Sequence, residues 1–134
     1  MIGAAGLVFL GAFGAAAAFA QATRPVSLIV PFSTGGATDS VARVIAPRLT
    51  DLIKRPVIVE NKPGATGVIG TQLVARAAPD GATILFGTSS SMGSSPAILP
   101  NLPYDVIKDF VAVGNVATTD NVLVVHPSIP VGNV

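Results

Sequence analysis

Residues 26–39 read VSLIVPFSTGGATD, and this stretch decides the fold class. Its first part, Val26 to Val30, is a short apolar run rich in β-branched residues and closed by a proline, as expected of a strand buried on both faces. The remainder is a loop of hydroxyl and glycine residues that ends at Thr38 and Asp39, either of which can cap a helix running to about Leu52. The stretch therefore predicts a strand, a glycine loop and a helix, in that order.

The same alternation continues downstream. Pro56 to Glu60 predicts a second strand, Val68 to Ala77 a second helix, and Thr83 to Gly87 a third strand. Apolar residues recur at helical spacing in the first helix, at Val41, Val44, Ile45, Leu49 and Leu52. In the second helix, Ile69, Leu73 and Val74 are expected to face inward. Two further runs, Val111 to Val116 and Val122 to Val125, have the composition of strands. This order predicts an α/β fold with a mainly parallel sheet flanked by helices.

The composition excludes several classes of function. The chain has 134 residues, with 8 Lys+Arg, 7 Asp+Glu, a single His, no Cys and a formal net charge of +1. So few charges form no basic stripe for a phosphate backbone, and we expect no nucleic-acid partner. The lack of Cys excludes disulfides and thiol catalysis. No acidic pair or His cluster has metal-ligand spacing, so we expect neither a metal nor a cofactor.

The first 22 residues differ from the rest of the chain. Every charged side chain lies at Arg24 or later, and the preceding segment is an apolar run that ends in small residues. Sites of the small-x-small type end at Ala20 and at Ala22, so residues 1–22 are predicted to be a cleaved export signal. The alternative is a retained membrane anchor, because the run is long enough to span a bilayer.

Two loops are candidates for a binding site. In open parallel sheets, ligands bind beyond the carboxyl ends of the strands, which here are followed by residues 32–39 and 88–95. Both loops are rich in hydroxyls, glycines and backbone amides, with Asp39 as their only charge, and both lead toward a helix N-terminus, where an anion is favoured. The pattern indicates a carboxylate or phosphate ligand. The alternative is that the glycines only turn the chain and that Thr38 or Asp39 only caps the helix.

An enzymatic site has little support in the sequence. Asp39 could act as a base or a metal ligand, but its place at a helix start favours capping. Ser89 to Ser91 lack the G-x-S-x-G frame of a nucleophile elbow. His126 has no evident acidic or serine partner nearby in sequence and is interpreted as a surface or structural residue. We expect no catalytic residue; a hydrolytic α/β enzyme that uses Asp39 or Ser89 is the rival hypothesis.

Three glycines stand at regular spacing near the middle of the chain. Gly64, Gly67 and Gly70 form G-x-x-G-x-x-G, which is neither a dinucleotide fingerprint nor a phosphate-binding Walker loop. We interpret the pattern as a turn followed by close packing of a helix.

A series of short motifs resembles the Bug-type substrate-binding proteins of tripartite tricarboxylate transporters, in order over essentially the whole predicted mature chain. The motifs are Val30-Pro31-Phe32, residues 35–39, residues 59–65, residues 79–83, Leu102-Pro103-Tyr104-Asp105, Asp109-Phe110 and residues 122–125. The resemblance implies a monomeric periplasmic protein of two lobes that closes over a small mono-, di- or tricarboxylate and delivers it to an inner-membrane permease. Such proteins are more than twice as long as this chain.

The resemblance also implies a division of the chain and a set of ligand-binding residues. Residues 23–116 correspond to part of the first lobe of a Venus-flytrap fold, and residues 117–134 to the start of the crossover toward a second lobe that this sequence lacks. A truncated remnant without function is the alternative. In the family, the loops matching 32–39 and 88–91 hold the carboxylate. The predicted ligand-binding residues are therefore Phe32, Thr34, Gly35, Gly36, Ala37, Thr38, Asp39, Thr88, Ser89 and Ser90.

Overall fold

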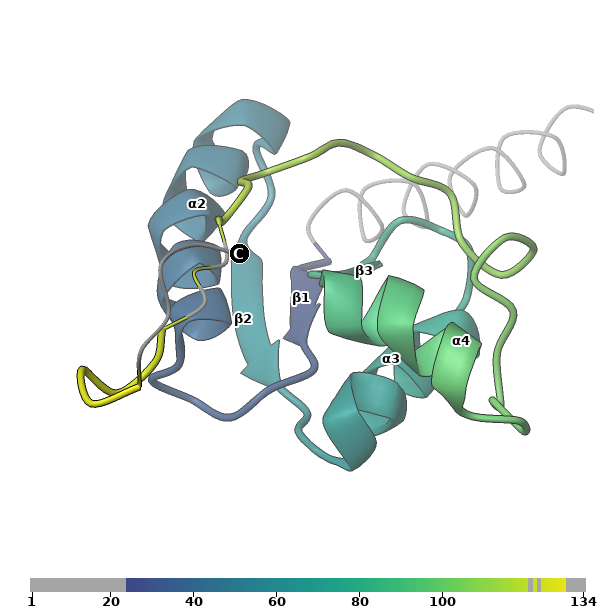
Figure 1. Cartoon of the computed structure of the whole chain (residues 1–134). Coiled ribbons are helices and arrows are strands. Elements are labelled where there is room, and N and C mark those ends of the chain that lie inside the picture. The colour runs from purple at the N-terminus through teal and green to yellow at the C-terminus, as the bar shows by residue number, and fades with distance from the viewer. Residues whose placement is uncertain (1–23, 121, 123, 130–134) are drawn as a thin grey trace, which may run out of the picture.

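A computed structural model describes residues 24–120, 122 and 124–129 (Figure 1). The predicted export signal lies outside these residues. The elements are strands β1 (Val26–Val30), β2 (Val57–Asn61) and β3 (Thr83–Leu85), the 3₁₀ turn η1 (Ala65–Gly67), the π-helical turn η2 (Ser90–Ser94), and helices α2 (Ala37–Ile53), α3 (Val68–Ala75) and α4 (Ser95–Ile98). Within the described residues, no helix has the length and apolarity needed to cross a membrane.

The three strands form one parallel sheet in the order β2-β1-β3. Val26 lies opposite Val57 on one side of the central strand, and Ser27 lies opposite Thr83 on the other. Helix α2 covers one face of the sheet, whereas α3 and α4 lie on the opposite side (Figure 1). The predicted α/β fold with a parallel sheet is confirmed. Because the strands run in one direction, the loops that follow them start from the same edge of the sheet.

The core is built on β1. Four of its five residues are buried, which confirms a strand covered on both faces. Leu28 and Val30 pack with Ala42 of α2, and the partly buried apolar residues around this cluster are Phe32, Ile45, Val57, Val59, Ile84 and Phe86. The small alanine lets the helix backbone approach the sheet closely, so the core here is shallow but tightly packed.

Small residues are the most deeply buried ones in both helices. In α2, Val44 and Leu52 are 73% and 78% exposed, while Ala42 and Ala46 are buried. In α3, Ile69 is 53% exposed and Leu73 41%, while Gly70 and Thr71 are buried. Small residues allow the short helix-to-sheet distance that brings the backbones together, and the larger apolar residues are left on the outer surface. The prediction of an inward face was therefore wrong for Ile69 and Leu73. In α2, Ile45 packs against the core, whereas Val44 and Leu52 do not.

Neither of the two further strands expected after the third one appears in the described residues. Residues 111–116 form no strand, and Val111 and Val113 are 92% and 90% exposed. Of residues 122–125, the described ones are likewise not in a strand, and Leu123 lies outside the description. A strand is stable only when its backbone pairs with a neighbour, and in the described part of the chain β2 and β3 pair with β1 alone. β3 also ends at Leu85 rather than at Gly87.

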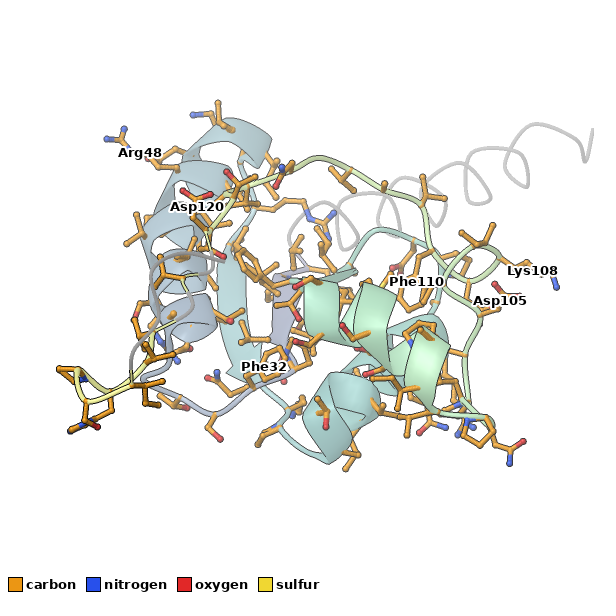
Figure 2. The ribbon with its side chains drawn as sticks, in the orientation of Figure 1. Phe32, Arg48, Asp105, Lys108, Phe110 and Asp120 are labelled. Carbon is orange, nitrogen blue, oxygen red and sulfur yellow. The ribbon has the colours of Figure 1, made fainter. Side chains whose placement is uncertain are left out.

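Tyr104 fastens the segment after α4 to the rest of the molecule. It is 7% exposed, and its hydroxyl donates a hydrogen bond of 2.9 Å to the carbonyl of Ser91. Its ring packs edge-to-face on Phe110, which is labelled in Figure 2. Burial raises the pKa of Tyr104 above its ordinary value, so the hydroxyl remains a proton donor at neutral pH. Tyr104 therefore links the segment after α4 to η2 through the carbonyl of Ser91.

We expect Tyr104→Phe to lower the free energy of unfolding by about 1 kcal/mol, because the substitution leaves the buried carbonyl of Ser91 without its donor and keeps the aromatic packing. Urea titration followed by circular dichroism measures the change. An unchanged midpoint with an unchanged slope would show that water replaces the lost bond at no cost.

Candidate functional site

The loops after the three strands meet at the carboxyl edge of the sheet. Gly67 of η1 is the meeting point, with a φ of +93°. A side chain carbon built on it would lie 3.3 Å from the ring of Phe32 in the first loop and 3.2 Å from Cβ of Ser91 in the third. Phe32 lies at the end of the sheet where these loops gather (Figure 2). The two loops singled out in the sequence therefore flank a common point, with the turn after β2 between them.

Asp39 organises the first loop from the first turn of α2. The residue is buried, with 2% of its surface exposed. One oxygen, Oδ2, accepts hydrogen bonds from the amide of Gly35 at 2.8 Å and from Nε of Arg43 at 3.0 Å, and Oδ1 accepts one from Asn61 at 2.9 Å. The hydrogen bond from Arg43, then those from Gly35 and Asn61, lower the pKa of Asp39 to about 2. The carboxylate is ionised and fully engaged within the protein.

The predicted N-cap of the first helix needs correction. The N-cap residue is Gly36 rather than Thr38 or Asp39, and α2 begins at Ala37. Asp39 is the third helical residue and reaches back to the amide of Gly35, just before the cap. This geometry resembles the reciprocal half of a capping box, in which an acidic residue at the third helical position accepts from a backbone N–H at the start of the helix. Asp39 thus has a capping role, but from the third helical position rather than as the N-cap residue.

Asn61 is the residue that the sequence analysis missed. Its Nδ2 donates to the carbonyl of Phe32 at 3.1 Å as well as to Asp39, and its Oδ1 accepts from Nη2 of Arg43 at 3.0 Å. Asn61 is the last residue of β2 and lies in register with Val30, the last residue of β1. A polar side chain at that register position, beside the start of the first loop, is the signal that could have identified it.

The start of α2 presents unpaired backbone amides. The first helical hydrogen bond runs from the amide of Ser40 to the carbonyl of Gly36 at 2.9 Å. The preceding N–H groups, those of Ala37, Thr38 and Asp39, have no intrahelical acceptor by the geometry of an α-helix. Together with the positive end of the helix dipole they form a surface suited to an anion. Gly35, Gly36 and Ala37 are exposed, so solvent or a ligand can reach the start of the helix.

The third loop divides into an inner and an outer part. Ser91 is fully buried, and its hydroxyl accepts the amide of Thr88 at 3.1 Å, while the amide of Met92 donates to the carbonyl of Thr88 at 2.9 Å. Thr88 and Ser91 therefore close a turn. Ser89 is exposed and Ser90 half-buried, so these two residues are the ones whose hydroxyls and amides remain near the surface.

The remaining motifs have structural roles. The described residues contain no group of three or more His, Asp or Glu side chains that could hold a metal ion. His126 is exposed, and its Nδ1 lies 2.7 Å from the hydroxyl of Ser128, so it does have a serine partner nearby in sequence, contrary to expectation. Gly70 confirms the predicted close packing, because a carbon added to it would lie 2.7 Å from the carbonyl oxygen of Lys62 and 2.9 Å from Cα of Pro31.

A parallel sheet between two helical layers, with amide-rich loops gathered at its carboxyl edge, defines the class: part of an α/β ligand-binding lobe of the periplasmic binding-protein type. Residues 41–134 match the model of the family described as "Tripartite tricarboxylate transporter family receptor". The chain belongs to this family. Its members are periplasmic solute-binding proteins and not enzymes, so the hydrolase hypothesis is set aside.

Three comparisons give the scale of the similarity. BugT of Bordetella pertussis is 41% identical over 126 residues, which cover 91% of this chain and 39% of BugT. The structure of MatC from Rhodopseudomonas palustris with bound malate superposes with a TM-score of 0.62 at 41% identity, over 65% of this chain and 30% of MatC. A second R. palustris protein, solved with adipate, gives 0.60 at 35% identity, over 63% of this chain and 28% of that protein. The chain thus spans two fifths or less of these relatives.

Proposed function

We propose that this chain is the first-lobe part of a periplasmic solute-binding protein that captures a small mono-, di- or tricarboxylate and delivers it to a tripartite-type inner-membrane permease. The observation that carries the proposal is the row of free amides at the start of α2, held open by the anchored loop before it. The malate and adipate bound by two structural neighbours support a carboxylate as the ligand. The family match supports delivery to a permease.

The proposed ligand contacts fall into two groups. In the first loop, the amides of Ala37 and Thr38 and the hydroxyls of Thr34 and Thr38 bind one carboxylate, and the third loop contributes Ser89 and Ser90. Phe32, Gly35, Gly36, Asp39 and Thr88 shape these loops around the ligand. The negative charge of Asp39 does not repel the ligand strongly, because the guanidinium of Arg43 lies 3.0 Å from it. Charge-assisted bonds from backbone amides to a carboxylate are among the stronger hydrogen bonds in proteins.

The proposal includes the organisation of the chain. Residues 1–22 would direct export and be removed near Ala20 or Ala22, residues 23–116 would form part of the first lobe, and residues 117–134 would lead toward the second. The binding unit would act as a monomer without a cofactor. Mass spectrometry of the exported protein tests the cleavage site directly.

Ala37→Pro is the sharpest test of binding. Proline is tolerated at the first helical position and lacks an N–H, and Gly36, with φ −77° and ψ 171°, already has the conformation that a following proline requires. We expect this variant to keep its stability and to bind malate or adipate roughly tenfold more weakly, as the loss of one charge-assisted hydrogen bond predicts. Amide chemical-shift titration by nuclear magnetic resonance measures both affinity and site.

Ala37→Ser is the matched control, because it keeps the amide and should keep the affinity. The diamides of the same acids are the ligand control, since they have the shape of the ligand without its charge. Shifts are expected at Ala37, Thr38, Ser89 and Ser90 with the acids alone. Equal shifts with the diamides, or no localised shift with any acid, would exclude carboxylate binding at these loops.

A further inference from the structure

We propose that Asn61 is a positioning residue of the carboxylate site: it holds the first loop in its binding shape from the end of β2 without touching the ligand. The inference rests on the proposed function, because it concerns the same loop. It assigns a role to a side chain outside both candidate loops.

The hydrogen bonds of Asn61 are directed at the protein. Both protons of its side-chain amide have acceptors, namely the carbonyl of Phe32 at 3.1 Å and Oδ1 of Asp39 at 2.9 Å. Its oxygen accepts from Nη2 of Arg43 at 3.0 Å. An asparagine has two donors and one carbonyl oxygen, so its donors are fully used and any effect on a ligand passes through these partners.

The side chain of Asn61 fixes the first loop at two points. Asn61 holds the carbonyl of Phe32 directly, and it holds the carboxylate of Asp39, which in turn accepts the amide of Gly35 at 2.8 Å. The exposed residues Ser33 and Thr34 lie between these ties. Gly36 and the free amides of α2 follow immediately, so their direction depends on the fixed loop.

Asn61 itself is held in place by the sheet. Asn61 is paired with Val30 in the sheet, and Val30 is fully buried. Loops fixed in the bound conformation before binding avoid the entropy cost of ordering, which raises affinity without a new contact. The position of Asn61 at the sheet end therefore suits preorganisation of the site.

Asn61→Asp is the informative variant. It removes the donor to Phe32 and places a carboxylate against Oδ1 of Asp39, so two acceptors face each other. The reciprocal double variant, Asp39→Asn with Asn61→Asp, restores a donor and an acceptor between positions 39 and 61 but leaves the carbonyl of Phe32 without its donor. Partial rescue by the double variant is the signature of the proposed tie.

Thr50→Val is the control for general destabilisation. In the wild type, the hydroxyl of Thr50 accepts a hydrogen bond of 2.9 Å from the amide of Val57. Thr50 therefore links the same helix and the same strand at the opposite end of the sheet. Valine has nearly the same shape and lacks the acceptor. This variant should lose stability and retain the affinity for malate.

The experiment measures two quantities in the wild type and the variants: hydrogen exchange of the Gly35 amide without ligand, and the dissociation constant for malate. In Asn61→Asp, we expect the Gly35 amide to lose its protection from exchange and malate to bind at least about tenfold more weakly. The double variant should regain part of the protection and part of the affinity. Asn61→Ser serves in its place if Asn61→Asp does not fold.

An affinity loss no larger than that of Thr50→Val, or full protection of Gly35 in Asn61→Asp, would overturn the positioning role. A wild-type protein that binds no carboxylate would instead overturn the proposed function, and the exchange of Gly35 would still report whether the tie exists. The two failures are therefore distinguishable.

Discussion

Gly70→Ala is expected to destabilise the protein by about 1–3 kcal/mol, as overpacking of a well-packed interior does. Helix propensity alone would predict the opposite change in stability, because alanine inside a helix is favoured over glycine by roughly 1 kcal/mol. The contacts decide the outcome. The added carbon would lie 2.7 Å from the carbonyl oxygen of Lys62 and 2.9 Å from Cα of Pro31. Both are backbone atoms, so α3 itself must move away from the sheet edge.

Gly93→Ala is the matched control. Gly93 also lies in a helical turn, η2, and its Cβ position has nothing within 4 Å. The control is expected to be neutral or slightly stabilising. Chemical denaturation of both variants measures the difference, and Gly70→Ala as stable as the wild type would mean that α3 adjusts its position without cost. Because Gly70 packs on Pro31 at the start of the first loop, the variant should also disturb the amides of that loop.

The fold could be predicted from the sequence because its central strand has an unambiguous pattern. Val26 to Val30 is apolar and β-branched, and the structure buries four of its five residues. The order of strands and helices then predicts the parallel sheet, since a helix between two strands carries the chain back to the starting edge, so that both strands run in the same direction. The strand-like run at 111–116 shows the limit of this reasoning. Amino-acid composition favours a strand conformation, but a strand also needs a neighbouring strand to pair with, and composition does not predict that long-range contact.

Periodicity was an incomplete guide to which helix residues are buried, for a related reason. Periodicity identifies the stripe with the largest apolar residues, whereas α2 and α3 pack on the sheet through Ala42, Ala46 and Gly70. Small residues carry little hydrophobic signal although they permit the closest approach of backbones. A stripe of Ala and Gly beside a glycine-rich loop was the available clue.

The candidate site could be located but not assembled from the sequence. The position of both loops follows from the parallel sheet, and the free amides follow from the start of α2. The role of Asn61 depends on the register between β1 and β2, which places it beside Val30. Likewise, Asp39 acts from the third helical position rather than as the N-cap, and its carboxylate is shared among Gly35, Arg43 and Asn61. Such sharing arises only from the tertiary arrangement.

Acid is expected to weaken the protein through Asp39. Its pKa is about 2, below the ordinary value of 3.8. A carboxyl group with a lowered pKa in the folded state stabilises that state fully above its unfolded pKa, and this contribution is lost as the pH falls through the folded value. The free energy of unfolding should therefore decline from about pH 4 toward about pH 2. Hydrogen bonds also lower the pKa of Glu60 and Asp105, which contribute to the same decline.

Asp39→Asn isolates the contribution of this one carboxylate. The new side-chain NH₂ would face the Nδ2 donor of Asn61 or the N–H donors of Gly35 and Arg43, so the variant should be less stable at neutral pH. It should also lose less stability than the wild type between pH 4 and pH 2, because the group that titrates there is gone. Asp51→Asn, an exposed position near the other end of α2, is the charge-matched control and should keep the wild-type decline. Urea titrations across this pH range measure all three proteins. Parallel curves for the wild type and Asp39→Asn would show that the buried carboxylate is not what links the stability of the loop to pH.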